Sequence, residues 1–237
     1  GMEKSYEEII KLLKLADDSA DVFKGSGTFL KSELEPVDSP AARDLAARAM
    51  NYSPERPLYV VAIDAITNIA SALLMNPTIS DSMVVVWLGG NAVDWPDARE
   101  FNLSQDVAAA RVVYNSGVSL ALLPCMGVVT ALTTTGPELA YWLSGKNALC
   151  DYLVRQTVNE AESYAKGKVW SRVIWDVAAV AWLLNDEGSL LRDRLIPTPI
   201  PEYDDHYAHD PTRPLCKYIY HISRDALLAD LFQKIGV

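Results

Sequence analysis

Acidic and amide side chains gather directly after one of the most apolar stretches of the chain. Met83 to Leu88 is a valine-rich run closed by two glycines, which predicts a short strand buried on both faces. The polar residues that follow are Asn91, Asp94, Asp97, Glu100 and Asn102. A carboxylate and amides can form paired hydrogen bonds with vicinal hydroxyl groups. Because open α/β sheets place their sites at the carboxyl ends of strands, we expect a ligand site in this segment.

The elements around this strand predict an α/β fold. Strand patterns occur at Leu58 to Ile63 and Leu120 to Leu123, on either side of Met83 to Leu88 in the chain. Helical patterns cover Ser5 to Leu15, Ser39 to Met50, Thr67 to Leu74 and Ser104 to Gly117. The alternation predicts an open, mainly parallel sheet with right-handed crossovers and helices on both faces.

The ends of the chain carry further expectations. Ser5 and Glu8 are spaced as a capping box, and the apolar face of that first helix predicts packing. Beyond Met126 we expect helices at Gly136 to Trp142, Leu149 to Ala165, Asp176 to Leu184 and Asp225 to Ile235. Leu215 to Ile222 alternates as an edge or late strand would, and Ile196 to His209 is a proline-rich acidic loop.

Composition limits the function classes. The chain has 237 residues, of which 50% are apolar, and this length fits one α/β domain spanning residues 1–237. A net charge of -10 argues against nucleic-acid or anionic-membrane binding. The three cysteines lack metal-site spacing, which favours reduced thiols in packing roles. Glu3 to Lys14 is amphipathic after a Gly1-Met2 start typical of an added glycine, and no apolar run reaches the roughly 20 residues of a membrane helix, so a cytoplasmic protein is expected.

Three stretches together resemble the inosine-uridine preferring nucleoside hydrolase family. Gly89-Gly90-Asn91, Glu100-Phe-Asn102 and Asp106-Val-Ala-Ala-Ala110 resemble its ribose-binding segment. Ala65-Ile-Thr-Asn-Ile-Ala70 is similar to its Leu-Thr-Asn-Ile-Ala turn, and Trp175-Asp-Val-Ala-Ala-Val-Ala181 to its His-Asp-Pro-x-Ala-Val-Ala helix start. The stretches follow the family's order between about Leu58 and Leu184, and Asp21 to Gly25 resembles one of its short strands.

One family feature has no counterpart in this sequence. Members open with a strand and an Asp-x-Asp-x-x-x-Asp-Asp loop that holds calcium and supplies the general base. Here Asp17, Asp18 and Asp21 follow a helical pattern instead. The resemblance therefore implies a nucleoside-hydrolase-like sheet without its first strand. Exposed apolar edges invite pairing, so we expect a homo-oligomer or a rearranged sheet.

The resemblance also assigns roles to residues. It implies ribose contacts from Glu100 and Asn102, with Asn91 or Asp94. It implies calcium as the cofactor, held by the Asp176 carboxylate and the Thr67 carbonyl, although most of the family's carboxylate ligands are absent and calcium takes about six to eight oxygens. Trp175 replaces a common family histidine; it can stack on a base or sugar but cannot protonate it.

Structural alternatives exist for several of these residues. Glu100 fits a solvated loop acid, while Asn102 and Asp176 fit helix caps. His206 and His209 lie in the late acidic loop, where they either reach the site mouth or face solvent.

Two functions are consistent with the sequence. One is a hydrolase that cleaves an N-ribosyl or related glycosyl bond. The other is a non-catalytic relative that binds a sugar or nucleoside-like ligand or serves in assembly. In both, the partner is a small-molecule nucleoside or sugar.

Overall fold

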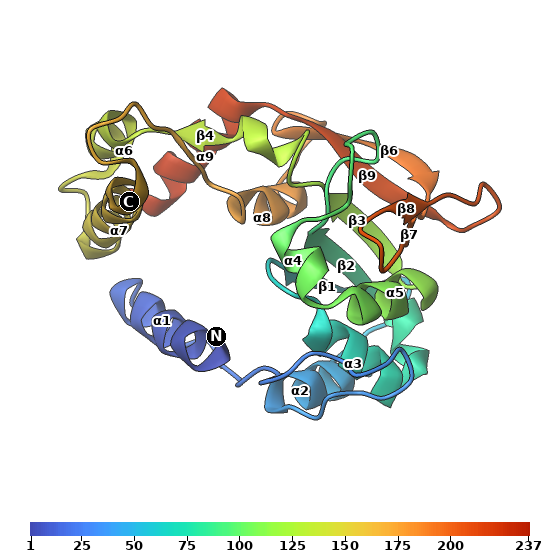
Figure 1. Cartoon of the computed structure of the whole chain (residues 1–237). Coiled ribbons are helices and arrows are strands. Elements are labelled where there is room, and N and C mark those ends of the chain that lie inside the picture. Colours follow the sequence, from blue (N-terminus) through green and yellow to red (C-terminus); the bar gives the residue numbers. More distant parts are fainter.

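The computed structural model describes residues 1–237 and is built around a five-stranded sheet in the order β1-β2-β3-β9-β6 (Figure 1). The strands are β1 (Leu58–Ala62), β2 (Met83–Leu88), β3 (Ser119–Leu123), β6 (Leu191–Pro197) and β9 (Leu215–Ile222). The first four strands in this order pair in parallel, and β6 runs antiparallel beside β9. The predicted α/β fold with a mainly parallel sheet is therefore confirmed.

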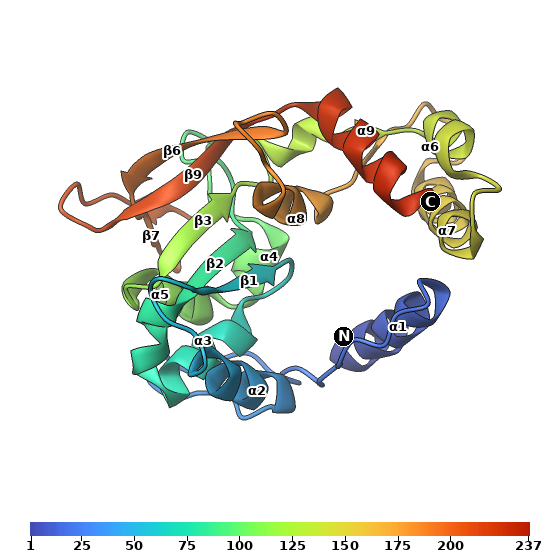
Figure 2. The ribbon, with the colours of Figure 1, turned by 180° about the vertical axis from the view of Figure 1, so that it is seen from behind.

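Helices cover both faces of the sheet (Figure 2). The helices α2 (Pro40–Ala49), α3 (Thr67–Met75) and α5 (Val107–Asn115) lie on one face, and α8 (Val177–Leu183) lies on the other. The helices α6 (Gly136–Leu143), α7 (Ala148–Ala165) and α9 (Arg224–Ile235) lie together near one end of the molecule. No helix is long and apolar enough to cross a membrane.

The remaining elements are the helix α1 (Met2–Leu15) and several short ones. The short elements are α4 (Phe101–Gln105), the 3₁₀ turns η1 (Pro77–Ser82) and η2 (Val129–Ala131), and the strands β4 (Thr133–Thr134), β5 (Arg172–Val173), β7 (Ile200–Pro201) and β8 (Tyr207–Ala208). The strands β4 and β5 form one antiparallel pair, and β7 and β8 form another.

Strand β2 is apolar throughout because its side chains pack into two hydrophobic cores, one on each face of the sheet. Val85 and Trp87 point into the core beneath α3 and α5, whereas Val86 and Leu88 point into the core beneath α8. All four are at most 1% exposed. Successive side chains of a strand point to opposite faces, so a strand covered on both sides must be apolar throughout.

Helix α1 differs from its prediction. It begins at Met2 without any side-chain cap, so Ser5 and Glu8 do not form the expected capping box. None of its residues is buried, and Ile9 and Ile10 are each 45% exposed, so the expected packing role is wrong. Figure 1 shows the reason, which is that α1 lies away from the sheet. It makes a polar contact with α7, where Lys11 Nζ donates a hydrogen bond to the Tyr152 hydroxyl at 2.7 Å.

Several sheet predictions also need correction. Strand β1 was expected to be buried, but it is the edge strand and Tyr59 is 51% exposed. The strand predicted at Leu215 to Ile222 is confirmed as the late strand β9, but it is not an edge, because the unpredicted β6 pairs with its outer side. Residues 21–25 form no strand, and the expected loop at Ile196 to His209 contains the β7–β8 hairpin. The sheet has no internal gap, and the formation of a homo-oligomer stays a prediction.

Candidate active site

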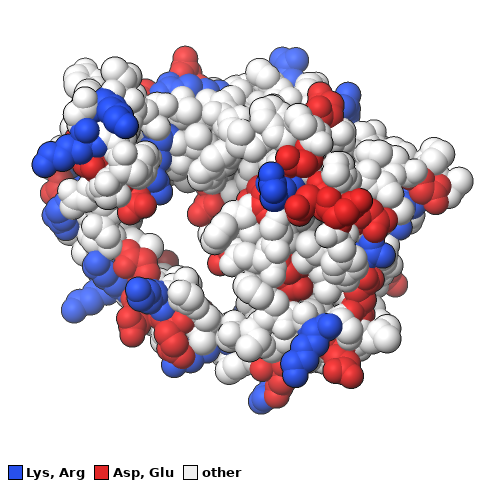
Figure 3. Space-filling model, in the orientation of Figure 1, with Lys and Arg blue, Asp and Glu red and all other residues white.

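A hollow of about 1370 Å³ lies between α1 and the carboxyl ends of β1, β2 and β3. Figure 3 shows it as an opening with Asp and Glu side chains on its rim. Of the seven residues predicted for the site, six line this cavity: Thr67, Asn91, Glu100, Asn102, Trp175 and Asp176. Asp94 is exposed and does not line it, so the structure separates this residue from the others.

Glu100 is the N-cap of α4 and not a solvated loop acid. Its side chain accepts hydrogen bonds from the backbone N–H groups of Asn102 at 2.9 Å and Leu103 at 3.0 Å. It also accepts from the Gly90 N–H at 2.9 Å. Two carboxylate oxygens accept about four hydrogen bonds in total, so the three backbone donors leave about one acceptor site free. These bonds fix Glu100 at the cavity wall.

Asn102 joins two strand ends instead of capping a helix. Its Nδ2 donates to the Leu88 carbonyl at 2.9 Å and more weakly to the Ile63 carbonyl at 3.5 Å. Its Oδ1 accepts no hydrogen bond from the chain. Asn102 therefore reaches the cavity with one unused acceptor, which is the group that a ligand hydroxyl requires.

Asn91 has no free group of this kind. Its Nδ2 donates to the Asp97 carbonyl at 3.1 Å, and its Oδ1 accepts from the Met126 N–H at 3.3 Å. Both ends of the amide thus connect the loop after β2 to its neighbours. Asn91 shapes the cavity wall in this arrangement.

The Asp176 side chain makes no hydrogen bond within the chain. It precedes α8, but its side chain makes no cap hydrogen bond, so the cap alternative is wrong. Burial raises the pKa of Asp176, and the negative charges of Asp64 and Glu100 act in the same direction. The residue nevertheless opens onto the cavity and its water. A carboxylate of raised pKa in a hollow is typical of functional sites.

The raised pKa predicts how Asp176→Asn changes stability with pH. Because the folded state holds this proton more tightly than the unfolded state, Asp176 disfavours folding as pH rises through its folded pKa. We expect Asp176→Asn to be more stable than wild type at neutral pH, by at most about 1 kcal/mol because the group opens onto water. The gain should vanish below about pH 3, under the ordinary pKa of an Asp side chain, because the group is then protonated in both the folded and the unfolded state.

Urea unfolding at both pH values measures this difference. Asp81→Asn is the matched control, because Asp81 is an exposed acid on η1. An equal gain for Asp176→Asn at both pH values would contradict the assignment.

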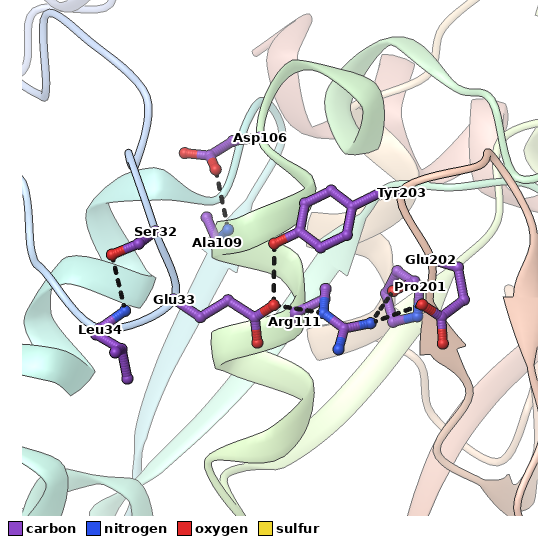
Figure 4. Close-up of polar contacts among 9 residues, drawn as sticks. All are labelled: Ser32, Glu33, Leu34, Asp106, Ala109, Arg111, Pro201, Glu202 and Tyr203. Atoms are coloured by element: carbon purple, nitrogen blue, oxygen red, sulfur yellow. Dashed lines mark hydrogen bonds and ion pairs between the residues drawn. The ribbon is translucent and has the colours of Figure 1, made fainter.

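Asp106 is a buried acid near the cavity that the sequence did not single out as a site residue. Asp106 is 4% exposed and caps α5 by accepting from the Ala109 N–H at 2.9 Å (Figure 4). Its other oxygen accepts from the Leu30 N–H at 2.9 Å and from the Thr67 hydroxyl at 2.6 Å. Asp106 therefore joins the 28–38 loop, α3 and α5.

Sequence reasoning missed other cavity residues. Asp64 and Asn68 line the cavity beside Thr67, and Cys125 lines it at the end of β3. Asn68 Oδ1 accepts hydrogen bonds from the backbone N–H and the hydroxyl of Ser26 at 2.8 and 2.9 Å. It thereby holds the turn Gly25-Ser26-Gly27. Their positions just beyond strands β1 and β3 were the available signal, because the rule that selected Glu100 applies to every parallel strand.

The two histidines do not reach the cavity. Neither His206 nor His209 lines it, and both are exposed. His206 lies in the turn of the β7–β8 hairpin, where its Nδ1 lies 2.9 Å from the Asp204 carbonyl oxygen. The solvent-facing alternative describes both residues.

The donor set does not fit calcium. No group of three or more His, Cys, Asp or Glu side chains converges to hold a metal ion. Thr67 begins α3, where its carbonyl faces along the helix, and Glu100 already accepts from three backbone donors. Asp176 and the Thr67 carbonyl are two oxygens where calcium takes about six to eight.

Comparison with known proteins gives a consistent result. The family model described as inosine-uridine preferring nucleoside hydrolase matches residues 1–213. The non-specific ribonucleoside hydrolases RihC of Salmonella typhi and Salmonella newport are each 28% identical over 184 residues, or 74% of this chain. The chain spans 58% of the length of these relatives.

Solved structures share the fold. The purine-preferring ribonucleoside hydrolase from Gardnerella vaginalis has a TM-score of 0.81 at 19% identity, covering 99% of this chain and 86% of that one. The inosine-uridine preferring nucleoside hydrolase from Bacillus anthracis has a TM-score of 0.65 at 16% identity, covering 84% of this chain and 65% of that one. At these identities the likeness concerns the fold alone.

Proposed function

Because the chain belongs to the inosine-uridine preferring nucleoside hydrolase family, we propose that it binds the ribosyl group of a nucleoside and hydrolyses the N-ribosyl bond. The observation that carries this proposal is the convergence of Glu100, Asn102 and Asp176 on one cavity. These groups come from two separate segments, the start of α4 and the start of α8, and the fold brings them to the carboxyl edge of the parallel sheet.

Ribose binding requires acceptors for vicinal hydroxyls. Asn102 offers its unused Oδ1. Glu100 offers the lone pair that its three backbone donors leave free. A ribose hydroxyl would donate a charge-assisted hydrogen bond to it. The backbone donors to Glu100 would stay in place and keep the carboxylate oriented.

Bond cleavage requires stabilisation of positive charge. Water forms a bond to the anomeric carbon while the carbon–nitrogen bond breaks, its electron pair leaves with the base, and the proton lost by the water ends on that base. Charge grows on the sugar as the base departs. Asp64, Glu100 and Asp176 lie close enough for their charges to interact, so they would favour that charge. Trp175 would stack on the base.

A second candidate is nucleoside binding without hydrolysis. One observation favours it: the donor set does not fit the family's calcium ion. In addition, Trp175 cannot protonate a leaving base. Both candidates share the ribose contacts and differ in the activation of water.

A ribose-release assay with inosine and uridine, run beside calorimetric titration with each nucleoside and with calcium, separates the candidates. Binding with turnover supports hydrolysis, whereas binding without turnover supports the second candidate. We expect Asn102→Ala to weaken nucleoside binding by about 10-fold, the usual value of one hydrogen bond. Asp94→Ala, outside the cavity, is the control. Absence of nucleoside binding would contradict both candidates.

A further inference from the structure

Two tyrosine hydroxyls hold the backbone of the segment Gly90–Val93. The Tyr218 hydroxyl accepts a hydrogen bond from the Val93 N–H at 3.1 Å. The Tyr207 hydroxyl packs against the backbone of Gly90. These tyrosines belong to β9 and β8, more than 100 positions along the chain from the segment they hold.

The fit around Tyr207 is close. Its hydroxyl lies where a Cβ on residue 90 would be, so only glycine leaves room for it. Gly90 also has a φ of 72°, a left-handed conformation that glycine adopts at little cost. The residue after Gly89 at the end of β2 is therefore glycine because the chain turns here against a tyrosine from another part of the molecule.

This segment controls the ribose-binding groups. The Gly90 N–H donates to Glu100, and the Asn91 side chain accepts from Met126 at the end of β3. A rotation of the peptide planes at Asn91 or Val93 would therefore move the donors that orient Glu100. Neither tyrosine lines the cavity, so any influence on a ligand must pass through this backbone.

Tyr207 is itself held by an anchored hairpin. The Ala98 N–H donates to the Asp205 carbonyl at 2.6 Å, which ties the β7–β8 turn to the same loop. On its other side, Arg111 of α5 donates to the Pro201 carbonyl at 2.8 Å, to Glu202 at 3.0 Å and to Glu33 at 2.6 Å (Figure 4). The hairpin is thereby fixed to α5 and to the 28–38 loop.

We propose that Tyr207 and Tyr218 are positioning residues, whose hydroxyls set the Gly90–Val93 backbone and through it the orientation of Glu100. The ligand in this inference is the nucleoside of the proposed function, on which its binding part rests. Its structural part concerns two amide protons and can be tested with no ligand present.

The variants Tyr207→Phe and Tyr218→Phe remove one hydroxyl each and keep the ring. Tyr220→Phe is the matched control, because Tyr220 is a half-exposed β9 tyrosine whose hydroxyl makes no hydrogen bond in the chain. Amide-resolved hydrogen exchange is measured on ligand-free protein. We expect exchange to be about 10-fold faster at Val93 in Tyr218→Phe, as for the loss of one hydrogen bond. In Tyr207→Phe we expect faster exchange at Gly90, because the hydroxyl that packs against this residue is gone.

Inosine binding is measured on the same proteins. We expect each variant to bind about 10-fold more weakly than Tyr220→Phe while its thermal unfolding midpoint stays within about 3 °C of that control. Unchanged exchange at Gly90 and Val93, or equal inosine binding by all variants, would overturn the inference. If wild type binds no nucleoside, the proposed function fails and the exchange rates alone decide the structural part.

Discussion

Replacement of Asp106 by alanine is expected to lower the free energy of unfolding by about 3–5 kcal/mol, because the buried donors that it leaves unpaired cost about 1–3 kcal/mol each. The donors are the Leu30 N–H, the Thr67 hydroxyl and the Ala109 N–H. A domain of this kind is stable by about 5–15 kcal/mol, so the loss is a large fraction of the total. Urea unfolding at neutral pH measures it.

Two further variants keep this prediction testable. Asp106→Asn retains one carbonyl oxygen, so it should cost less than alanine, about 1–3 kcal/mol, and gives a folded protein if alanine does not. Asp81→Ala removes an exposed acid and should change stability by less than about 0.5 kcal/mol. An Asp106→Ala protein as stable as the Asp81→Ala protein would show that the three donors find other partners.

Asp106 also shows where sequence reasoning ends. Its part in a family-like stretch was visible, but its role depends on Leu30 and Thr67, which lie 76 and 39 positions away. No local pattern encodes such a contact. The strand at Met83 to Leu88 was predictable because burial on both faces leaves a local sign, an uninterrupted apolar run.

The errors have the same physical origin. Strand β6 lies at the edge of the sheet, and edge strands often carry charged side chains. Its charged residues Arg192, Asp193 and Arg194 interrupt the alternation of apolar and polar residues by which a strand is predicted. Helix α1 has a clear amphipathic pattern but no buried residue. An amphipathic pattern indicates that one face of a helix can be buried, but it does not indicate whether another part of the chain covers that face. Glu100 was assigned to the site on its residue type, and its capping bonds became visible only with the fold.

The largest functional effect is expected for Glu100→Ala. This change removes a charge from the cavity wall and the cap of α4, which leaves the N–H groups of Gly90, Asn102 and Leu103 without their acceptor. A charge-assisted hydrogen bond to a hydroxyl contributes about 1.5–3 kcal/mol. We therefore expect inosine binding, measured by calorimetry, to weaken by about 10- to 100-fold.

Comparison with two other variants assigns the cause. Asp94→Ala removes an exposed acid from the same loop and should bind inosine as wild type does, because Asp94 lies outside the cavity. Glu100→Gln retains one acceptor oxygen, so it should recover part of the cap without the charge. If Glu100→Gln binds as wild type does, the cap is what the ligand requires; if it binds as weakly as alanine, the charge is required. Equal losses for Asp94→Ala and Glu100→Ala would remove Glu100 from the ribose site and leave it a structural cap.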